Sequence, residues 1–356
     1  MVALPTISYT ERYEHPMVDT SNQIESRNAL DVMDKAGALF EVRYPPATWG
    51  ADNDGHPMVE SGINEGLPLY KWVVREDTNE PLGLHSGTFA ESGSYRHVGA
   101  MAEKMFPNST ETCTLFGKGE RMVLTQKISE AIDLGGGDTI QPSLMWISSF
   151  NGQWSTSVYD LIGRLFCANQ LVGQSPLFSV KHTKHHDVTF EQRTHVLTEA
   201  IKHAENVGRM AKVMKDQEFT DDQFRELTKM IVPLPPFIKD KDNLPTDQIH
   251  ARSERTMINN RGAMTNMWQK ECTEFGTVRK PTGQVETVLA SMSPSEQVEI
   301  FDGNKWLAYN AVQGAEQHNI NARFQQTAAA RERALTKAVN GTTPYAERAW
   351  GLLNAN

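Results

Sequence analysis

Residues 142–187 read PSLMWISSFNGQWSTSVYDLIGRLFCANQLVGQSPLFSVKHTKHHD, and this stretch decides the fold that we expect. Two runs rich in aromatic and β-branched residues, 143–150 and 154–160, flank the dipeptide Asn151-Gly152. An Asn-Gly pair between two such runs is the strongest short-range signal of a β-hairpin, because both central residues of the tight turn need positive φ. The stretch therefore predicts an antiparallel hairpin.

The stretch continues into the most basic part of the chain. Residues 181–215 carry seven Lys or Arg against four Asp or Glu, together with five histidines, whereas the whole chain has a formal net charge of −9. From Thr189 to Lys215 the apolar residues recur at three- and four-residue steps, which predicts an amphipathic helix. A local positive excess in an acidic chain predicts a local anion-binding surface and argues against a protein that coats nucleic acid with its whole surface.

The rest of the chain predicts an α+β fold, with antiparallel β-hairpins in the N-terminal half packed with helices and a largely helical C-terminal half. In the first half we expect helices at 21–37 and 99–106, strands at 39–44 and 95–98, and hairpins that join 69–75 to 82–85 and 112–116 to 122–128. In the second half we expect helices at 220–230, 247–275 and 344–353, and helices with a break within 295–337.

The same reading predicts a domain organisation. We expect an N-terminal arm (1–22), an α+β core domain (23–232), a proline-rich connector (233–246) and a helical C-terminal region (247–356) that packs on the core. Three cysteines lie far apart without metal-binding spacing, and an odd number suits a reducing cytoplasm. No segment approaches 18 apolar residues, and the start lacks a signal-peptide pattern, so we expect a soluble cytoplasmic protein.

Basic and aromatic residues together favour single-stranded nucleic acid as the ligand. Such proteins combine a basic groove for the phosphates with aromatic faces on which bases stack. The predicted hairpins offer the aromatic residues Trp72, Tyr95, Phe150, Trp154 and Tyr159, most of which a strand usually buries. The predicted nucleic-acid-binding residues are Arg75, Arg96, Trp154, Arg164, Lys181, His182, Lys184, Arg193, Lys202, Arg209 and Lys212.

A metal site is the sharpest alternative within the basic segment. His182, His185 and His186 are imidazole side chains of the kind that bind transition metals, with Asp187 or His195 as a further ligand. However, no acidic partner has the spacing of known zinc helices, and no carboxylate is placed as a general base. Histidines beside lysines more often form a solvated or polyanion-facing edge, so we expect no metal and no cofactor.

Nothing in the sequence marks an enzyme. The glycine-rich segments 117–120 and 135–138 lack the spacing and the strand–loop–helix setting of a phosphate-binding loop, so we interpret them as turns. No Gly-x-Ser-x-Gly elbow, Cys–His pair or catalytic carboxylate pair is apparent. We therefore expect a binding protein.

Four motifs in order resemble a phage- and plasmid-borne family that is catalogued as a domain of unknown function. They are Phe150-Asn-Gly-Gln-Trp, the segment 158–171 with Cys167, Val180-Lys-His-Thr, and the run from Trp306 to His318. Where the family has an aspartate-glycine turn, this chain has Asn151-Gly152, so the chain resembles a divergent member. The resemblance implies a phage or plasmid context and names no reaction.

Antiparallel hairpins crossed by a basic helix are also similar, at the level of fold, to the core of phage single-strand annealing proteins. This analogy and the basic segment favour an oligomeric protein that binds single-stranded DNA in recombination or replication. Two alternatives remain open. One is a host-inhibiting or antirestriction protein whose acidic surface is functional, and the other is a metal-dependent nuclease or hydrolase centred on His182, His185 and His186.

Overall fold

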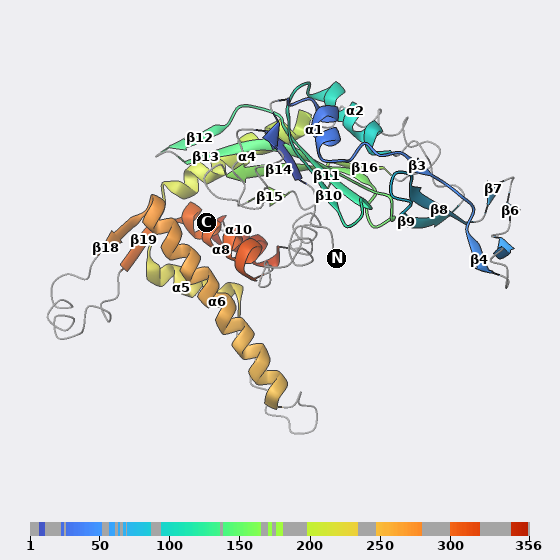
Figure 1. The fold of residues 1–356 in the computed structure, drawn as a ribbon. Helices are drawn as coiled ribbons and strands as arrows, with labels where there is room; N and C mark the ends of the chain where they lie inside the picture. Colours follow the sequence, from blue (N-terminus) through green and yellow to red (C-terminus); the bar gives the residue numbers. More distant parts are fainter. Residues whose placement is uncertain are drawn as a thin grey trace, which may run out of the picture. The chain divides into compact units, whose positions relative to one another are not determined.

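Figure 1 shows the fold of the 356-residue chain in a computed structural model. The structure describes residues 7–10, 23–24, 26–51, 57–60, 63–64, 67–68, 70–86, 94–135, 138–164, 170–172, 176–180, 198–233, 247–279, 300–320 and 343–354. The chain forms two compact units, and each is described by itself. Unit 1 comprises residues 1–132, 141–163 and 170–205, and unit 2 comprises residues 133–140, 164–169 and 206–356.

Unit 1 contains most of a nine-stranded sheet with the order β15-β14-β13-β11-β10-β1-β2, in which β12 pairs with β13 and β16 pairs with β14. The strands are β1 Ile7–Thr10, β2 Gln23–Ile24, β10 Thr110–Phe116, β11 Arg121–Lys127, β12 Ile132–Gly135, β13 Asp138–Ser149, β14 Thr156–Arg164, β15 Gln170–Val172 and β16 Phe178–Val180. β11 pairs antiparallel with both β10 and β13. The α+β class and the antiparallel hairpins of the first half are therefore confirmed.

One face of this sheet packs against two helices, α1 (Ala29–Lys35) and α2 (Tyr95–Met105), as Figure 1 shows. Met33 of α1, Val98 of α2 and Trp146 of β13 belong to one buried apolar cluster. Burying such large side chains stabilises each by about 1.5–3 kcal/mol relative to solvent exposure. The core of unit 1 therefore lies between the two helices and the middle of the sheet.

β13 is buried from Ile140 to Ser149 although several of its side chains are polar. The Ser148 hydroxyl lies 3.0 Å from the Thr156 hydroxyl on the neighbouring strand, and the backbone N–H of Trp154 donates to Ser149 Oγ over 2.9 Å. Buried polar groups stabilise a fold only when they are hydrogen-bonded. These bonds explain how a strand with two consecutive serines lies inside the protein.

A smaller sheet in unit 1 has the order β3-β8-β9. Its strands are β3 Val42–Arg43, β8 Tyr70–Arg75 and β9 Pro81–Ser86, and two ribbons precede β8, namely β4 Thr48–Ala51 with β5 Pro57–Glu60 and β6 Ile63–Asn64 with β7 Leu67–Pro68. β8 pairs antiparallel with β9, so the predicted hairpin of 69–75 and 82–85 is confirmed.

Unit 2 consists mainly of helices, and α4 (Thr198–Lys215) begins in unit 1 and ends in unit 2. Its other elements are β17 Glu218–Phe219, α5 Asp221–Ile231, α6 Asp247–Phe275, β18 Thr277–Arg279, β19 Ile300–Asn304, α8 Lys305–Gly314, the π-helix η5 Ala315–Ile320 and α10 Pro344–Asn354. The predicted helix 247–275 is thus confirmed at both ends. α5 starts with the predicted cap, because Thr220 and Gln223 form a reciprocal capping box.

Helix α8 is the centre of unit 2, since every residue from Trp306 to Gly314 is buried. A helix buried on all sides needs partners for its polar groups. The indole N–H of Trp306 donates to the buried carboxylate of Asp138 over 3.0 Å, and Glu316, which follows the helix, accepts from the backbone N–H of Ala346 over 2.9 Å. Buried carboxylates in this unit therefore anchor aromatic side chains and a helix start.

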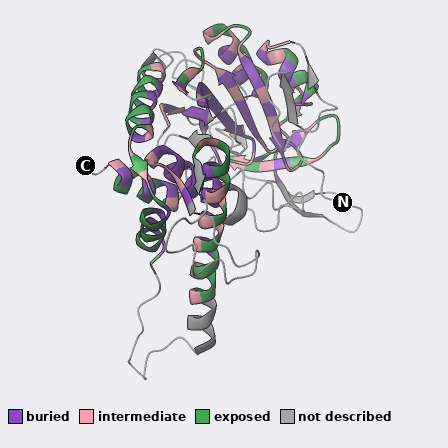
Figure 2. Cartoon of the chain, turned by 90° about the vertical axis from the view of Figure 1, so that its left-hand side faces the viewer, coloured by how far each residue is buried: buried purple, intermediate pink, exposed green. Residues whose placement is uncertain are grey.

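Helix α6 is only partly packed. Its C-terminal half places Trp268 against Phe224 of α5 with ring centroids 4.7 Å apart and nearly parallel planes. In contrast, no residue from Ser253 to Asn259 is buried, and Figure 2 shows this part of the helix in green and pink. The burial of unit 2 is thus concentrated around α8 and the C-terminal half of α6.

Two predictions of local structure were wrong in the first half. The helix expected at 21–37 begins only at Ala29, because Asn28 caps it through a bond from the Leu30 N–H, and Gln23–Ile24 forms the strand β2. The strand expected at 95–98 is the first turn of α2. Ser94 accepts from the His97 N–H there, so capping outweighs the strand preference of an aromatic residue.

Two further predictions need correction. β13 and β14 are neighbouring strands joined through Asn151-Gly152 as expected, but β13 ends at Ser149 and β14 begins at Thr156, so the connection is longer than a two-residue turn, and Gly152 has positive φ (74°) whereas Asn151 does not. In the second half, Ile300–Asn304 is the strand β19 rather than helix, because it pairs with β17 and β18. The predicted connector lies outside the described residues except for Pro233.

Candidate nucleic-acid interface

The β8–β9 hairpin presents two chemically different faces. Trp72 pairs with Leu84 and Tyr70 pairs with Ser86, and the side chains of these residues share one face because successive side chains of a strand alternate. Tyr70, Trp72 and Leu84 are 48%, 36% and 38% exposed. Adjacent exposed apolar side chains are common where proteins contact a partner or ligand, which makes this face a candidate binding surface. We call Tyr70, Trp72 and Leu84 the outer aromatic face.

One cation lies on the same face. Arg43 of β3 pairs with Val74 of β8, which is two residues from Trp72 along the strand. The guanidinium of Arg43 is exposed and donates to the side-chain oxygen of Asn79. Asn79 is neutral, so this bond orients Arg43 without cancelling its charge. The outer aromatic face therefore combines two aromatic rings, one aliphatic side chain and one positive charge.

The opposite face holds the hairpin against the rest of unit 1. Lys71, which pairs with His85, is buried with its ammonium 4.9 Å from the centroid of the Tyr44 ring. The Nε2 atom of His85 contacts the backbone oxygen of Phe150. Burial lowers the pKa of His85 below its usual value of 6.5, the bond to Phe150 opposes this, and the charge of Lys71 adds to it. His85 thus joins the hairpin to the start of the Asn151-Gly152 connection.

A glycine makes this close approach feasible. A Cβ atom at Gly83 would lie 2.3 Å from the Phe150 oxygen and 2.8 Å from the Cα of Asn151, which is closer than real contacts allow. Only glycine lets strand backbone approach another backbone to this extent. The inner face of the hairpin therefore packs directly on the backbone of Phe150 and Asn151. This contact also fixes the position of the outer aromatic face on the other side of the same strands.

Trp154, predicted to contact nucleic acid, is buried instead. It is 7% exposed, its ring packs edge-on against Phe116 at 5.7 Å, and the guanidinium of Arg121 lies 5.1 Å from its centroid. Tyr95 and Phe150 are also buried, with ring centroids 4.3 Å apart. These rings are covered by protein, so none of them presents a face on which a base can stack.

Two predicted arginines of unit 1 are described. Arg75 bonds to the carboxylate of Asp77 over 2.6 Å and lies over the ring of Phe40, and its bond lowers the pKa of Asp77. Arg96 is exposed and lies 3.7 Å from the carboxylate of Glu41. Asp77 neutralises Arg75 in place, whereas the solvated pair of Arg96 is weak and exchangeable. Arg96 is therefore the better phosphate contact of the two.

Helix α4 exposes three more predicted residues. Lys202 lies 2.8 Å from Glu199, and this hydrogen bond raises the pKa of Lys202. Arg209 donates to the side chain of Asn206, and Lys212 is exposed. The solvent side of α4 thus carries cations together with acids rather than an unbroken basic stripe.

The remaining predicted residues lie outside the described part of the chain. They are Lys181, His182, Lys184 and Arg193, the metal alternative His185 and His186, and the side chain of Arg164. Within the part that the structure describes, no three His, Cys, Asp or Glu side chains gather as a metal-binding group. The basic segment 181–197 remains a prediction from sequence.

Sequence reasoning missed Tyr70, Leu84 and one acid–base pair. The alternation in the run 70–75 pointed to Tyr70, because it shares a face with Trp72, but Leu84 needed the register between the strands. The pair is His203 Nδ1 with Asp160 Oδ2, 2.6 Å apart, which joins α4 to β14 in unit 1. Asp160 is buried and His203 is half exposed, a contact between residues 43 positions apart that no local pattern indicates.

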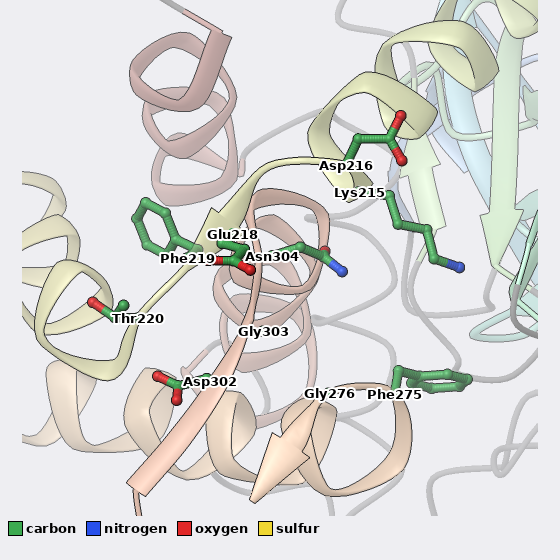
Figure 3. Close-up of a pocket in the computed structure, with 10 residues that line it drawn as sticks. All are labelled: Lys215, Asp216, Glu218, Phe219, Thr220, Phe275, Gly276, Asp302, Gly303 and Asn304. Carbon is green, nitrogen blue, oxygen red and sulfur yellow. The ribbon is translucent and has the colours of Figure 1, made fainter.

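Unit 2 contains a separate pocket of about 490 Å³, drawn in Figure 3. Asp216, Glu218 and Asp302 contribute carboxylates to its lining, and the ammonium of Lys215 donates to the backbone oxygen of Gly135. Three acids against one lysine favour a cation over a phosphate. The lining of the pocket is therefore unsuited to nucleic acid.

A family model matches residues 95–339, which is more than half of the chain. The chain belongs to the family described as domain of unknown function DUF932. The match includes α2, β10 to β19 and α8, and it begins after the β8–β9 hairpin. No curated protein and no solved structure matches the chain. Membership of DUF932 therefore names a family without an activity.

Among the described residues that carried the resemblance to DUF932, the aromatic residues around Asn151-Gly152 and most of the run from Trp306 to His318 are buried. Phe150 and Trp154 are buried, and so is the run from Trp306 to Glu316. Among the described helices, none has the length and apolar character needed to cross a lipid bilayer. The surface that distinguishes unit 1 chemically is thus the outer aromatic face, which precedes the matched region.

Proposed function

We propose that the protein binds single-stranded DNA and that the outer aromatic face holds its bases. The observation that carries the proposal is the exposure of Trp72 beside Tyr70 and Leu84 on one sheet face. Stacking of an unpaired base on an aromatic ring contributes about 1–3 kcal/mol and tolerates every base, because each has a π-face. A duplex already covers its base faces by stacking within itself, so this surface favours single strands.

Phosphate contacts supply the second part of the proposed binding energy. Arg43 lies on the same face with a neutral hydrogen-bond partner, and the basic segment 181–215 adds positive charge elsewhere in the chain. Each phosphate that a cation neutralises releases condensed counterions, which makes affinity fall with salt. With a net charge of −9 the protein repels DNA over the rest of its surface, so binding is confined to the basic and aromatic residues.

The family resemblance suggests the biological setting of this proposal. A phage- or plasmid-encoded protein with these properties acts in recombination or replication in the host cytoplasm, as a homo-oligomer without a cofactor. Annealing of complementary strands needs no catalytic residue, because neutralised phosphates let two strands approach while stacking keeps the bases unpaired. The exposed aromatic residues and the local cations support this role.

The direct test is fluorescence anisotropy with a labelled single-stranded oligonucleotide, titrated across salt, with a duplex of the same sequence in parallel. We expect tighter binding of the single strand and an affinity that falls as salt rises. Failure to bind at low salt would contradict the proposal and would favour a protein partner for the exposed face.

Variants separate the aromatic and the basic contributions. Trp72→Ala should weaken binding about 5- to 150-fold, which corresponds to the loss of one stacked base, without changing the salt dependence. Lys181→Glu with Lys184→Glu should weaken binding and flatten the salt dependence. Leu352→Ala is the matched control, because Leu352 is an exposed apolar residue (42%) of unit 2, and it should leave the affinity unchanged.

A further inference from the structure

The two rings of the outer aromatic face have a defined spacing. Tyr70 and Trp72 are two residues apart on β8, and a strand rises about 3.4 Å per residue, so the two attachment points are about 6.8 Å apart. Stacked neighbours in a nucleic-acid strand are about 3.4 Å apart. Two neighbouring bases that each lie on one of these rings are therefore pulled out of their mutual stack.

The exposed fractions indicate how the rings meet a base. Tyr70 and Trp72 are 48% and 36% exposed, so protein covers roughly half or more of each side chain. The exposed part of each ring is enough for one base to stack on it, so the two rings together can hold two bases.

The charges beside the outer aromatic face limit the length of nucleic acid that it can hold. Arg43 lies across from Val74, so its attachment point is about 7–8 Å from that of Trp72, and its exposed guanidinium, which donates to Asn79, can meet a phosphate that follows the base on Trp72. The turn after β8 carries the exposed carboxylate of Glu76, which repels a phosphate. A nucleic-acid strand that runs past Tyr70 and Trp72 therefore gains contacts as far as Arg43 and meets the repulsion of Glu76 beyond it.

We infer that the outer aromatic face binds a unit of two consecutive unpaired nucleotides, one base on Tyr70 and one on Trp72, with Arg43 at the adjoining phosphate. This inference rests on the proposed single-strand binding and gives its site a footprint. It also supplies a reason for single-strand selectivity, because paired bases in a duplex cannot separate to the spacing of the two rings without losing their stack.

The footprint is tested with 12-nucleotide strands of abasic sites that carry no thymine, one thymine, two adjacent thymines or two thymines separated by four abasic sites. Affinity should rise about 5- to 150-fold with the first thymine and again with an adjacent second one. The separated pair should resemble the single thymine. Trp72→Ala and Tyr70→Ala should each abolish the gain from the second thymine, whereas Trp72→Phe and the control Leu352→Ala should retain it.

Position is tested by replacing each thymine in turn with 5-iodouracil and irradiating the complex, because this base cross-links to an aromatic ring on which it stacks. Cross-links at Tyr70 and Trp72 are expected. If an all-thymine strand binds but the thymine number has no effect, or the cross-links map elsewhere, the two-nucleotide footprint is wrong while single-strand binding stands. If no strand binds, both proposals are wrong.

Discussion

Two aromatic-rich strand pairs of unit 1 differ in how far their aromatic side chains are exposed. Around the Asn151-Gly152 connection, Phe150 and Trp154 are 1% and 7% exposed, whereas in the β8–β9 hairpin Trp72 is 36% exposed. The first pair lies within the nine-stranded sheet, where Phe116 and Arg121 cover the Trp154 ring. The second pair belongs to a three-stranded sheet in which Tyr70, Trp72 and Leu84 are exposed.

The difference shows that aromatic content alone does not identify a binding surface. Both strand pairs read alike in sequence, and the position of each within its sheet decides which rings remain accessible. The inner face of the hairpin, with Lys71, His85 and Gly83, is what makes the outer face usable. Because the inner-face contacts already fix the hairpin, the outer aromatic face loses little conformational entropy when a ligand binds.

The largest expected effect is on stability. Trp154→Ala removes a buried indole and should lower the free energy of unfolding by about 3–5 kcal/mol. Trp72→Ala removes a partly exposed indole and should lower it by about 1 kcal/mol or less. Urea denaturation followed by circular dichroism measures both. Equal losses would mean that the two tryptophans do not differ in burial, and the comparison would fail.

The second prediction concerns the close approach behind the hairpin. Gly83→Ala places a Cβ atom against the Phe150 oxygen, so backbone must shift, at a cost of about 1–3 kcal/mol. The control is Gly262→Ala in α6, where nothing lies within 4 Å of the new atom and the better helix propensity should stabilise by about 0.5–1 kcal/mol. Thermal denaturation of both variants gives the opposite signs expected. A neutral Gly83→Ala would show that the hairpin does not rest on Phe150.

The smallest expected effect depends on pH. Because the pKa of His85 in the folded protein is lower than its unfolded value of 6.5, the unfolded state binds the proton more readily. The contribution of His85 is therefore complete above pH 6.5 and is lost as the pH falls through the folded-state pKa. His85→Gln keeps a donor for the Phe150 oxygen without titrating, so its stability should fall less than that of the wild type between pH 7 and pH 5. If the stability of both proteins falls equally between pH 7 and pH 5, His85 does not contribute to the pH dependence.

The sequence predicted those elements whose signals are local. The hairpin of β10 and β11, the capping box at Thr220 and the helix from Asp247 to Phe275 all follow from adjacent residues. The strand β19 did not, because Ile300–Asn304 pairs with strands at 218–219 and 277–279, and the pairing outweighs the helical pattern that follows it. Long-range pairing is the information that local periodicity lacks.

The same contrast between local and long-range information applies to the residues of the candidate site. Trp72 was recognised as an aromatic residue of a hairpin, but its exposure depended on Gly83 and His85 lying against Phe150, a contact across 65 residues. Trp154 was expected to bind nucleic acid because nothing local indicates that Phe116 and Arg121 cover it. The basic residues 181–184 lie outside the described residues, so their part in binding remains a prediction from charge.

The central claim is that Trp72 contacts single-stranded DNA while Trp154 does not. The protein has seven tryptophans, so labelling with 5-fluorotryptophan gives seven fluorine resonances, of which two are assigned by Trp72→Phe and Trp154→Phe. On addition of a thymine oligonucleotide we expect the Trp72 resonance to shift and the Trp154 resonance to stay. A Trp72 resonance that stays unchanged while the oligonucleotide binds would contradict the account.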